Sequence, residues 1–169
     1  GEWDIFISYA SEDREIAQLV CNVLTVDCGK KVWMDNRGGI MPGDNYWSAI
    51  QHGIEHSNKF LFIITESYLE KAVDKNHKYP NGTIQPTGVY KEIELIKQCL
   101  LLRKKDGSKG YSIPLIVEGT RVTYTDSNDT IHTNVPLKNG MLEILPKSKE
   151  YQMLQTDWLF CNIQDMMCS

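Results

Sequence analysis

The sequence lacks several features that would place it quickly in a class of proteins. No apolar run reaches the roughly eighteen residues that a membrane span requires, so we expect no membrane-spanning segment. Its five cysteines are an odd number without metal-ligand spacing, which argues against a disulfide framework and predicts a reducing compartment, the cytoplasm. The formal net charge of -4 argues against a nucleic-acid partner.

What the chain does have is an alternation of strand and helix patterns. Apolar runs rich in β-branched and aromatic residues predict strands at 4–7, 31–35, 59–65 and 111–117. Helical patterns follow the first three strands. They predict one helix that begins at Ser11 and three others at 44–55, 66–73 and 88–104. The order predicts one α/β domain over residues 1–169, with a parallel sheet of about five strands and helices on both faces.

Three segments carry more detailed expectations. Ser8 and Ser11 are expected to act as helix caps, and the first helix is expected to bury one apolar stripe, formed by Ile16, Leu19, Val20, Val23 and Leu24. The turn-forming residues of the 74–87 loop argue against regular structure there. Residues 120–125 and 130–137 are expected to pair as a hairpin, whereas 151–166 is ambiguous.

Four motifs in a fixed order resemble the TIR (Toll/interleukin-1 receptor-like) domain family, in its bacterial members. They are Asp4-Ile5-Phe6-Ile7-Ser8-Tyr9-Ala10-Ser11-Glu12-Asp13, Val32-Trp33-Met34-Asp35, Pro42-Gly43-Asp44 before Trp47, and Ser57-Asn58-Lys59-Phe60. The resemblance covers about 4–117 and leaves 118–169 as a divergent carboxyl-terminal extension. It implies a flavodoxin-like, doubly wound sheet and one of two functions: cleavage of the nicotinamide–ribose bond of NAD, or noncatalytic assembly through TIR contacts.

The resemblance also implies a catalytic glutamate. Breaking an N-glycosidic bond builds positive charge on the ribose, which a carboxylate stabilises. Many relatives carry the acid one helical turn after a tryptophan, which here is Gln51 after Trp47, so the chain is either a natural variant or an inactivated one. Other bacterial members resemble the segment 89–93 and imply Glu92 as the acid. The alternative for Glu92 is an ordinary acidic residue near a helix N-terminus.

Topology predicts where the candidate residues meet. Helices that follow parallel strands begin at the carboxyl edge of the sheet, so Trp47 and Glu92 should face the same crevice as Tyr9 and Asp35. With NAD as substrate, and no other cofactor or metal implied, the expected substrate-binding residues are Tyr9, Ala10, Asp35, Arg37 and Trp47. Trp47 either stacks on a ring of NAD or packs in the core, and Arg37 either binds phosphate or is a solvated loop charge.

Several alternatives compete with this hypothesis. His52-Gly53-Ile54-Glu55-His56 matches an inverted zinc-peptidase motif, although its place at a helix end favours exposed polar residues. A second hypothesis is that the domain, which has no glutamate after Trp47, acts only as an assembly module through the 36–44 loop. A related sheet architecture performs nucleoside deoxyribosyl transfer with a glutamate nucleophile. For the enzyme, the resemblance implies antiphage defence signalling, activation by self-association, and a fused or partner effector domain.

Overall fold

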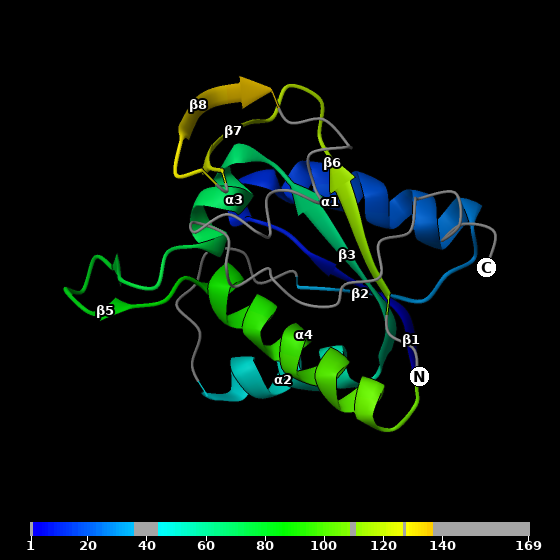
Figure 1. The fold of residues 1–169 in the computed structure, drawn as a ribbon. Coiled ribbons are helices and arrows are strands. Elements are labelled where there is room, and N and C mark those ends of the chain that lie inside the picture. The colour runs from blue at the N-terminus through cyan, green and yellow to red at the C-terminus, as the bar shows by residue number, and fades with distance from the viewer. Residues whose placement is uncertain (1, 36–43, 109–110, 127, 137–169) are drawn as a thin grey trace.

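The computed structural model describes residues 2–35, 44–108, 111–126 and 128–136. Its main sheet is parallel and has four strands in the order β2-β1-β3-β6. These strands are β1 (Trp3–Ser8), β2 (Val32–Met34), β3 (Ser57–Ile64) and β6 (Tyr111–Ile116). Helix α1 (Arg14–Asn22) lies on one side of the sheet, and α2 (Asp44–Glu55) and α4 (Gly88–Lys105) lie on the other (Figure 1). The predicted α/β architecture is confirmed.

The strand order creates a switch point between β1 and β3. From β1 the chain crosses to β2 on one side and then returns to β3 on the other, and β1 pairs in parallel with both. The apolar strand β3 also pairs with β6, so its predicted central position is confirmed. In open α/β sheets the carboxyl ends of the strands at such a point form the edge where ligands bind.

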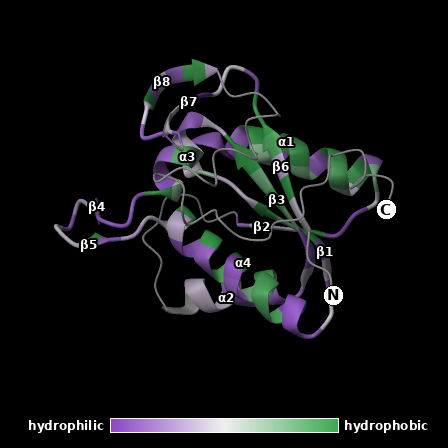
Figure 2. Cartoon of the chain, in the orientation of Figure 1, coloured by the Kyte–Doolittle hydropathy of each residue, from purple (hydrophilic) through white to green (hydrophobic). Residues whose placement is uncertain are grey.

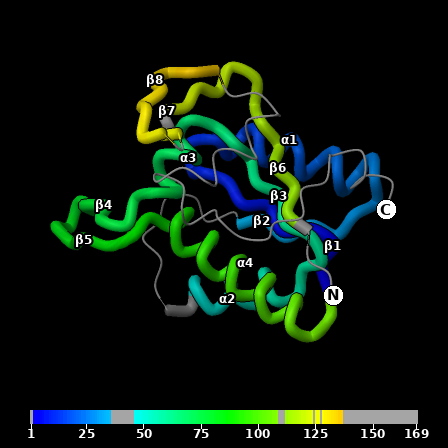
Figure 3. Tube along the Cα trace, in the orientation of Figure 1, coloured from blue at the N-terminus to red at the C-terminus, as the bar shows by residue number. Residues whose placement is uncertain are grey.

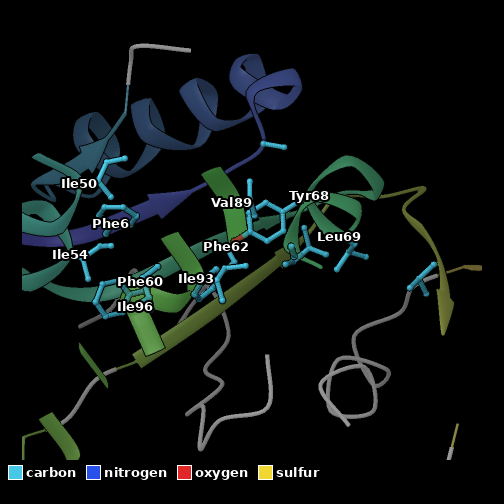
Figure 4. Close-up of a cluster of buried hydrophobic side chains, with 14 residues drawn as sticks. Phe6, Ile50, Ile54, Phe60, Phe62, Tyr68, Leu69, Val89, Ile93 and Ile96 are labelled. Atoms are coloured by element: carbon cyan, nitrogen blue, oxygen red, sulfur yellow. The ribbon is translucent and has the colours of Figure 1, made fainter. Parts of the chain in front are cut away.

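Each face of the sheet buries its own apolar layer. One layer joins β1 and β3 to α2, α3 (Glu66–Ala72) and α4, and includes Phe6, Ile50, Phe60, Tyr68 and Ile93 (Figure 4). The other layer joins the sheet to α1 and includes Ile5, Ile7, Ala17, Leu24 and Leu61. Residues of β1 alternate between the two layers, as the period of a strand requires.

The first helical segment begins without the predicted serine caps. A 3-10 turn, η1 (Ser11–Asp13), precedes α1, and a π-helical turn, η2 (Val23–Asp27), follows it. The Ser11 hydroxyl donates to the Glu12 carboxylate, and no side chain caps either η1 or α1. The backbone closes the turn instead, because the Asp13 N–H donates to the Ala10 carbonyl at 2.8 Å. The prediction of a Ser11 cap is wrong.

The buried face of α1 also differs from the prediction. Ala17 and Leu24 are buried there, with Val20 and Cys21 packed beside them. A second set of residues at helical spacing stays exposed, and we call it the α1 stripe: Ile16 (36% exposed), Leu19 (66%), Val23 (37%) and Val26 (79%). Figure 2 shows hydrophobic residues recurring along this helix. Both stripes have the helical period, and the small Ala17 side chain lets its own face approach the sheet closely.

Two hairpins lie outside the main sheet. The 74–87 segment forms a short antiparallel pair of β4 (His77–Lys78) and β5 (Ile84–Gln85), so the prediction of no regular structure is wrong. Its turn uses Gly82 at φ +84°, and the hairpin projects away from the sheet (Figure 3). The second hairpin, β7 (Arg121–Thr125) with β8 (Ile131–Pro136), confirms the predicted pairing. No helix within the described ranges is long and apolar enough to cross a membrane.

Leu19 of α1 and Leu24 of η2 provide a matched test of how the first helical segment faces the sheet. Leu24→Ala should lower the free energy of unfolding by about 3 kcal/mol, because it leaves a cavity in the layer under α1. Leu19→Ala should change it by no more than about 0.5 kcal/mol, because Leu19 is 66% exposed. Urea denaturation of both variants measures the difference. Equal losses would contradict the orientation of α1.

Candidate active site

Asp35 anchors a group of side chains at the carboxyl edge of the sheet. It directly follows β2, and its backbone carbonyl accepts a hydrogen bond from the Tyr9 hydroxyl, one residue beyond β1. Its carboxylate accepts a second hydrogen bond from the hydroxyl of Tyr46, near the start of α2. These contacts tie the ends of two neighbouring strands to the helix on one face of the sheet.

Glu92 reaches the same group from α4. The hydroxyl of Thr87 caps this helix by accepting from the Tyr90 N–H at 3.1 Å, and it donates to the Lys71 carbonyl of α3 at 2.6 Å. These bonds fix the turn that carries Glu92. The pKa of Glu92 is raised to about 8, because burial raises it more than a hydrogen bond from Ser8 lowers it, and the charge of Asp35 adds to the effect of burial. Some solvent contact remains at Glu92.

The Ser8 hydroxyl, which lowers the pKa of Glu92, meets a buried tyrosine. Ser8 is fully buried at the end of β1, and its Oγ lies 2.8 Å from the hydroxyl oxygen of Tyr68 on α3. The prediction of a capping role for Ser8 is therefore wrong. Ser8, Tyr46 and Tyr68 lie in the site although the sequence patterns did not predict them there. A signal existed for Ser8 alone, since the period of a strand places it on the same face as Phe6, toward α2 and α4.

The tyrosines of this group remain protonated in the physiological pH range. Burial and the charge of Asp35 raise the pKa of Tyr9 to about 12, with Glu92 adding to the effect and Arg14 opposing it. Burial, the hydrogen bond to Asp35 and its charge raise the pKa of Tyr46 above its ordinary value. The site therefore presents two carboxyl groups among neutral hydroxyl donors.

Trp47 and Ala10 lie beside this group. Trp47 is half-buried, packs against the core layer and meets the ring of Tyr46 edge-on, with 5.5 Å between ring centroids. The Lys91 ammonium lies 5.1 Å from the centroid of the Trp47 ring. The indole thus has both core contacts and a cation on its ring. Ala10 is fully buried in the same layer.

The remaining predicted residues lie apart from Glu92 or outside the described ranges. Gln51 is exposed on α2, and its side-chain amide donates to the Glu55 carboxylate at 2.9 Å, one turn along the same helix. Arg37 and most of the 36–44 loop fall outside the residues that the structure describes. The structure thus brings together Tyr9, Asp35, Trp47 and Glu92 without Gln51.

The two histidines of the zinc-like motif lie on the surface. His52 and His56 have ring centroids 4.1 Å apart, and His52 Nε2 lies 3.3 Å from the carboxylate of Glu2. Within the described residues, no group of three or more histidine, cysteine or acidic side chains could hold a metal ion.

The chemistry of the arrangement centres on Glu92. A carboxyl group whose pKa is raised by burial, and that keeps some solvent contact, can change its ionisation when a ligand brings charge. A cation placed next to Glu92 would favour the carboxylate form, and the carboxylate would stabilise positive charge on the ligand. The group is thus suited to act on a cationic ligand or transition state.

Comparisons with known proteins assign the family. Residues 5–137 match the TIR domain family. The protein named "Probable 2' cyclic ADP-D-ribose synthase TcpO" from Methanobrevibacter olleyae is 32% identical over 118 residues, which cover 68% of this chain and 33% of the relative. The chain thus spans about a third of the length of that relative.

Two solved structures are similar at lower identity. The TIR domains of the activated Roq1 resistosome, which directly recognises the pathogen effector XopQ, are 18% identical with a TM-score of 0.44, over 66% of this chain and 57% of that one. A prokaryotic SEFIR domain is 17% identical with a TM-score of 0.41, over 92% of this chain and 94% of that one. The family match extends from β1 to the end of β8, and the chain belongs to the TIR domain family.

Proposed function

We propose that this domain binds NAD and cleaves its nicotinamide–ribose bond, releasing nicotinamide and an ADP-ribose product, linear or cyclic. The observation that carries the proposal is the position of Glu92 in the first turns of α4, within electrostatic reach of Asp35 at the switch point of the sheet. The name of the Methanobrevibacter relative, a probable 2' cyclic ADP-D-ribose synthase, supports the same substrate class.

In this proposal Glu92 acts on the ribose. As the bond between C1′ and the ring nitrogen breaks, its electron pair leaves with nicotinamide, and positive charge develops on the sugar. The Glu92 carboxylate stabilises that charge. Capture of the sugar cation by water gives linear ADP-ribose, and capture by a hydroxyl of the same molecule gives a cyclic product. In both cases the attacking oxygen then loses its proton to solvent.

The charge of the substrate matches the ionisation of the site. The nicotinamide ring of NAD is positively charged, and a nearby cation favours the carboxylate form of a glutamate. Substrate binding therefore converts Glu92 to its reactive form, which burial disfavours in the free protein. Tyr9, Asp35 and Trp47 line the substrate site, and the neutral hydroxyl of Tyr46 holds the Asp35 carboxylate in place.

A noncatalytic role in TIR–TIR assembly is favoured by a different observation, the exposed α1 stripe. Its four apolar side chains recur along one face of α1 and η2, and exposed apolar patches of this kind mark surfaces that associate. As an enzyme in antiphage defence the domain would use the same surface, because self-association would activate it. Assays of NAD cleavage separate the two roles.

The main test is nicotinamide release from NAD by concentrated protein. Glu92→Gln should lower kcat at least about 100-fold, because the isosteric amide carries no charge to stabilise the sugar cation. Glu94→Gln, an exposed position on the same helix, serves as the matched control and should leave kcat unchanged. Activity that appears only in Gln51→Glu would transfer the catalytic role to position 51. No release from any of these proteins would leave the assembly role.

The pH dependence of the reaction gives a second test. The value of kcat/KM should rise with pH around an apparent pKa near 8, since the free protein holds the Glu92 proton up to that range and the reaction requires the carboxylate. The rise in kcat should occur at lower pH, because the bound nicotinamide cation favours ionisation. Initial rates of nicotinamide release measure both profiles. A kcat/KM that is flat between about pH 6 and 9 would contradict the assignment.

The stability of Glu92→Gln gives a third test that needs no substrate. The unfolded chain releases this proton near pH 4.5 and the folded protein near pH 8, so the folded protein loses stability as pH rises between these values. Glu92→Gln removes that loss. The variant should be more stable than the parent by roughly 2 kcal/mol above about pH 8.5, a value reduced for the solvent contact of Glu92, with little difference near pH 4. Thermal denaturation at both pH values measures the effect, and a variant less stable at high pH would refute it.

A further inference from the structure

We propose that the Lys91 ammonium, held over the Trp47 ring, binds the diphosphate of NAD and makes the site select substrates that carry phosphate. We call Lys91 together with the Trp47 ring the Lys91 subsite. Its role in substrate choice rests on the proposed NAD cleavage, whereas its affinity for a diphosphate does not. Lys91 would touch the substrate itself, so it is a specificity-determining residue.

The two carboxyl groups of the candidate site match only one part of NAD. The site presents the carboxyl groups of Glu92 and Asp35 among the neutral hydroxyls of its tyrosines. These acids suit the nicotinamide cation, but when ionised they repel the negative charges of the diphosphate. A dinucleotide therefore needs a cation beside the acids, separated from them by the width of a ribose.

Lys91 supplies a cation in such a place. It precedes Glu92 on α4, and because 3.6 residues make one turn, the two side chains diverge from the helix. The Lys91 ammonium lies 5.1 Å from the centroid of the Trp47 ring. That ring meets Tyr46 edge-on at 5.5 Å, and Tyr46 donates to the Asp35 carboxylate. A continuous row of contacts thus leads from Lys91 to the carboxyl edge of the sheet.

The Trp47 ring is held in place on several sides. It is half-buried and packs against the core layer between the sheet and α4. Its outer edge reaches the first residue of α4, since a Cβ atom at Gly88 would lie 3.9 Å from Trp47 Cη2. A ring that is held in this way limits where the Lys91 side chain lies. The lysine therefore loses less conformational freedom when a ligand binds.

The ammonium keeps its hydrogen-bonding capacity while it lies over the ring. An ammonium has three N–H donors, and an aromatic face attracts its charge without offering an oxygen acceptor. Among the residues that the structure describes, no carboxylate forms an ion pair with Lys91, and Glu94, one turn along α4, is exposed. A hydrogen bond between charged groups is stronger than a cation–π contact at a partly exposed site. A phosphate oxygen therefore competes successfully with the ring for the ammonium.

Two other cations of the described chain lie in different places. Arg14, whose charge lowers the pKa of Tyr9, begins α1, on the opposite side of the sheet from α4 (Figure 1). Lys75 is exposed before β4, and its ammonium lies 5.9 Å from the centroid of the Tyr90 ring. Of the three, Lys91 is the cation carried by the same helix as the proposed acid.

Binding of ADP-ribose tests the subsite, because this ligand carries the diphosphate and lacks nicotinamide. Lys91→Met removes the charge and keeps a flexible side chain over the ring, and it should weaken binding about tenfold or more. Lys91→Arg keeps the charge and should restore most of the affinity. Adenosine, which has no phosphate, should bind the parent and Lys91→Met equally. Isothermal titration calorimetry measures these affinities.

Lys97→Met is the matched control. It makes the same change in net charge further along α4 and should bind ADP-ribose as the parent does. A loss of affinity in this variant equal to that in Lys91→Met would reduce the effect to net charge and overturn the proposal.

The second readout is nicotinamide release from NAD and from nicotinamide riboside, which has the same cationic bond and no phosphate. Lys91→Met should lower kcat/KM for NAD about tenfold or more, mostly by raising KM. It should leave kcat/KM for nicotinamide riboside unchanged. A purely structural role for Lys91 would lower both values alike.

The outcomes separate the subsite from the reaction. Equal ADP-ribose affinity in the parent and Lys91→Met, including no binding to either, overturns the proposal. Equal losses of affinity for ADP-ribose and adenosine also overturn it, because Lys91 then does not recognise phosphate. ADP-ribose binding that depends on Lys91, in a protein that releases no nicotinamide, supports the subsite and refutes the proposed function. NAD cleavage with unchanged kcat/KM in Lys91→Met refutes the subsite and supports the function.

Discussion

Backbone pairing between β1 and β3 sets the position of every side chain in the candidate site. The two strands are in parallel register, with Ser8 opposite Phe62, and β2 and β6 extend the sheet on either side. Because the strands are parallel, the segments that carry Tyr9 and Asp35 leave the sheet at the same edge. A slip of β1 by one residue would turn Ser8 toward α1 and away from α4. The site therefore exists only in this register.

The proposed reaction needs the ionised form of Glu92, and burial makes that form costly for the stability of the folded protein. Burial favours the neutral form of the Glu92 carboxyl group, and the nearby charge of Asp35 adds to that effect. The donors that approach the two acids are hydroxyl groups, from Ser8 to Glu92 and from Tyr46 to Asp35. Such donors orient a carboxylate without neutralising its charge, so the group stays responsive to a positively charged ligand.

Sequence patterns predicted the strands and their edge correctly and failed where tertiary packing decides. Apolar runs located β1 and β3, and the topology argument placed Tyr9 and Glu92 near each other, in agreement with the effect of Glu92 on the pKa of Tyr9. The two stripes of α1 share one helical period, so periodicity alone could not indicate which one faces the sheet. The contact between Ser8 and Tyr68 spans 60 residues and has no local signature.

The base of the β4–β5 hairpin is closed before the chain enters α4. The Thr87 N–H donates to the Asp74 carbonyl at 3.1 Å, and the Thr87 hydroxyl donates to the Lys71 carbonyl at 2.6 Å. These bonds hold the two ends of the hairpin together whatever lies between them. Each doubling of a flexible loop adds only about 0.6 kcal/mol of closure entropy. The turn at Asn81-Gly82 is therefore a place where evolution, or a protein engineer, can insert residues while the helix that carries Glu92 keeps its position.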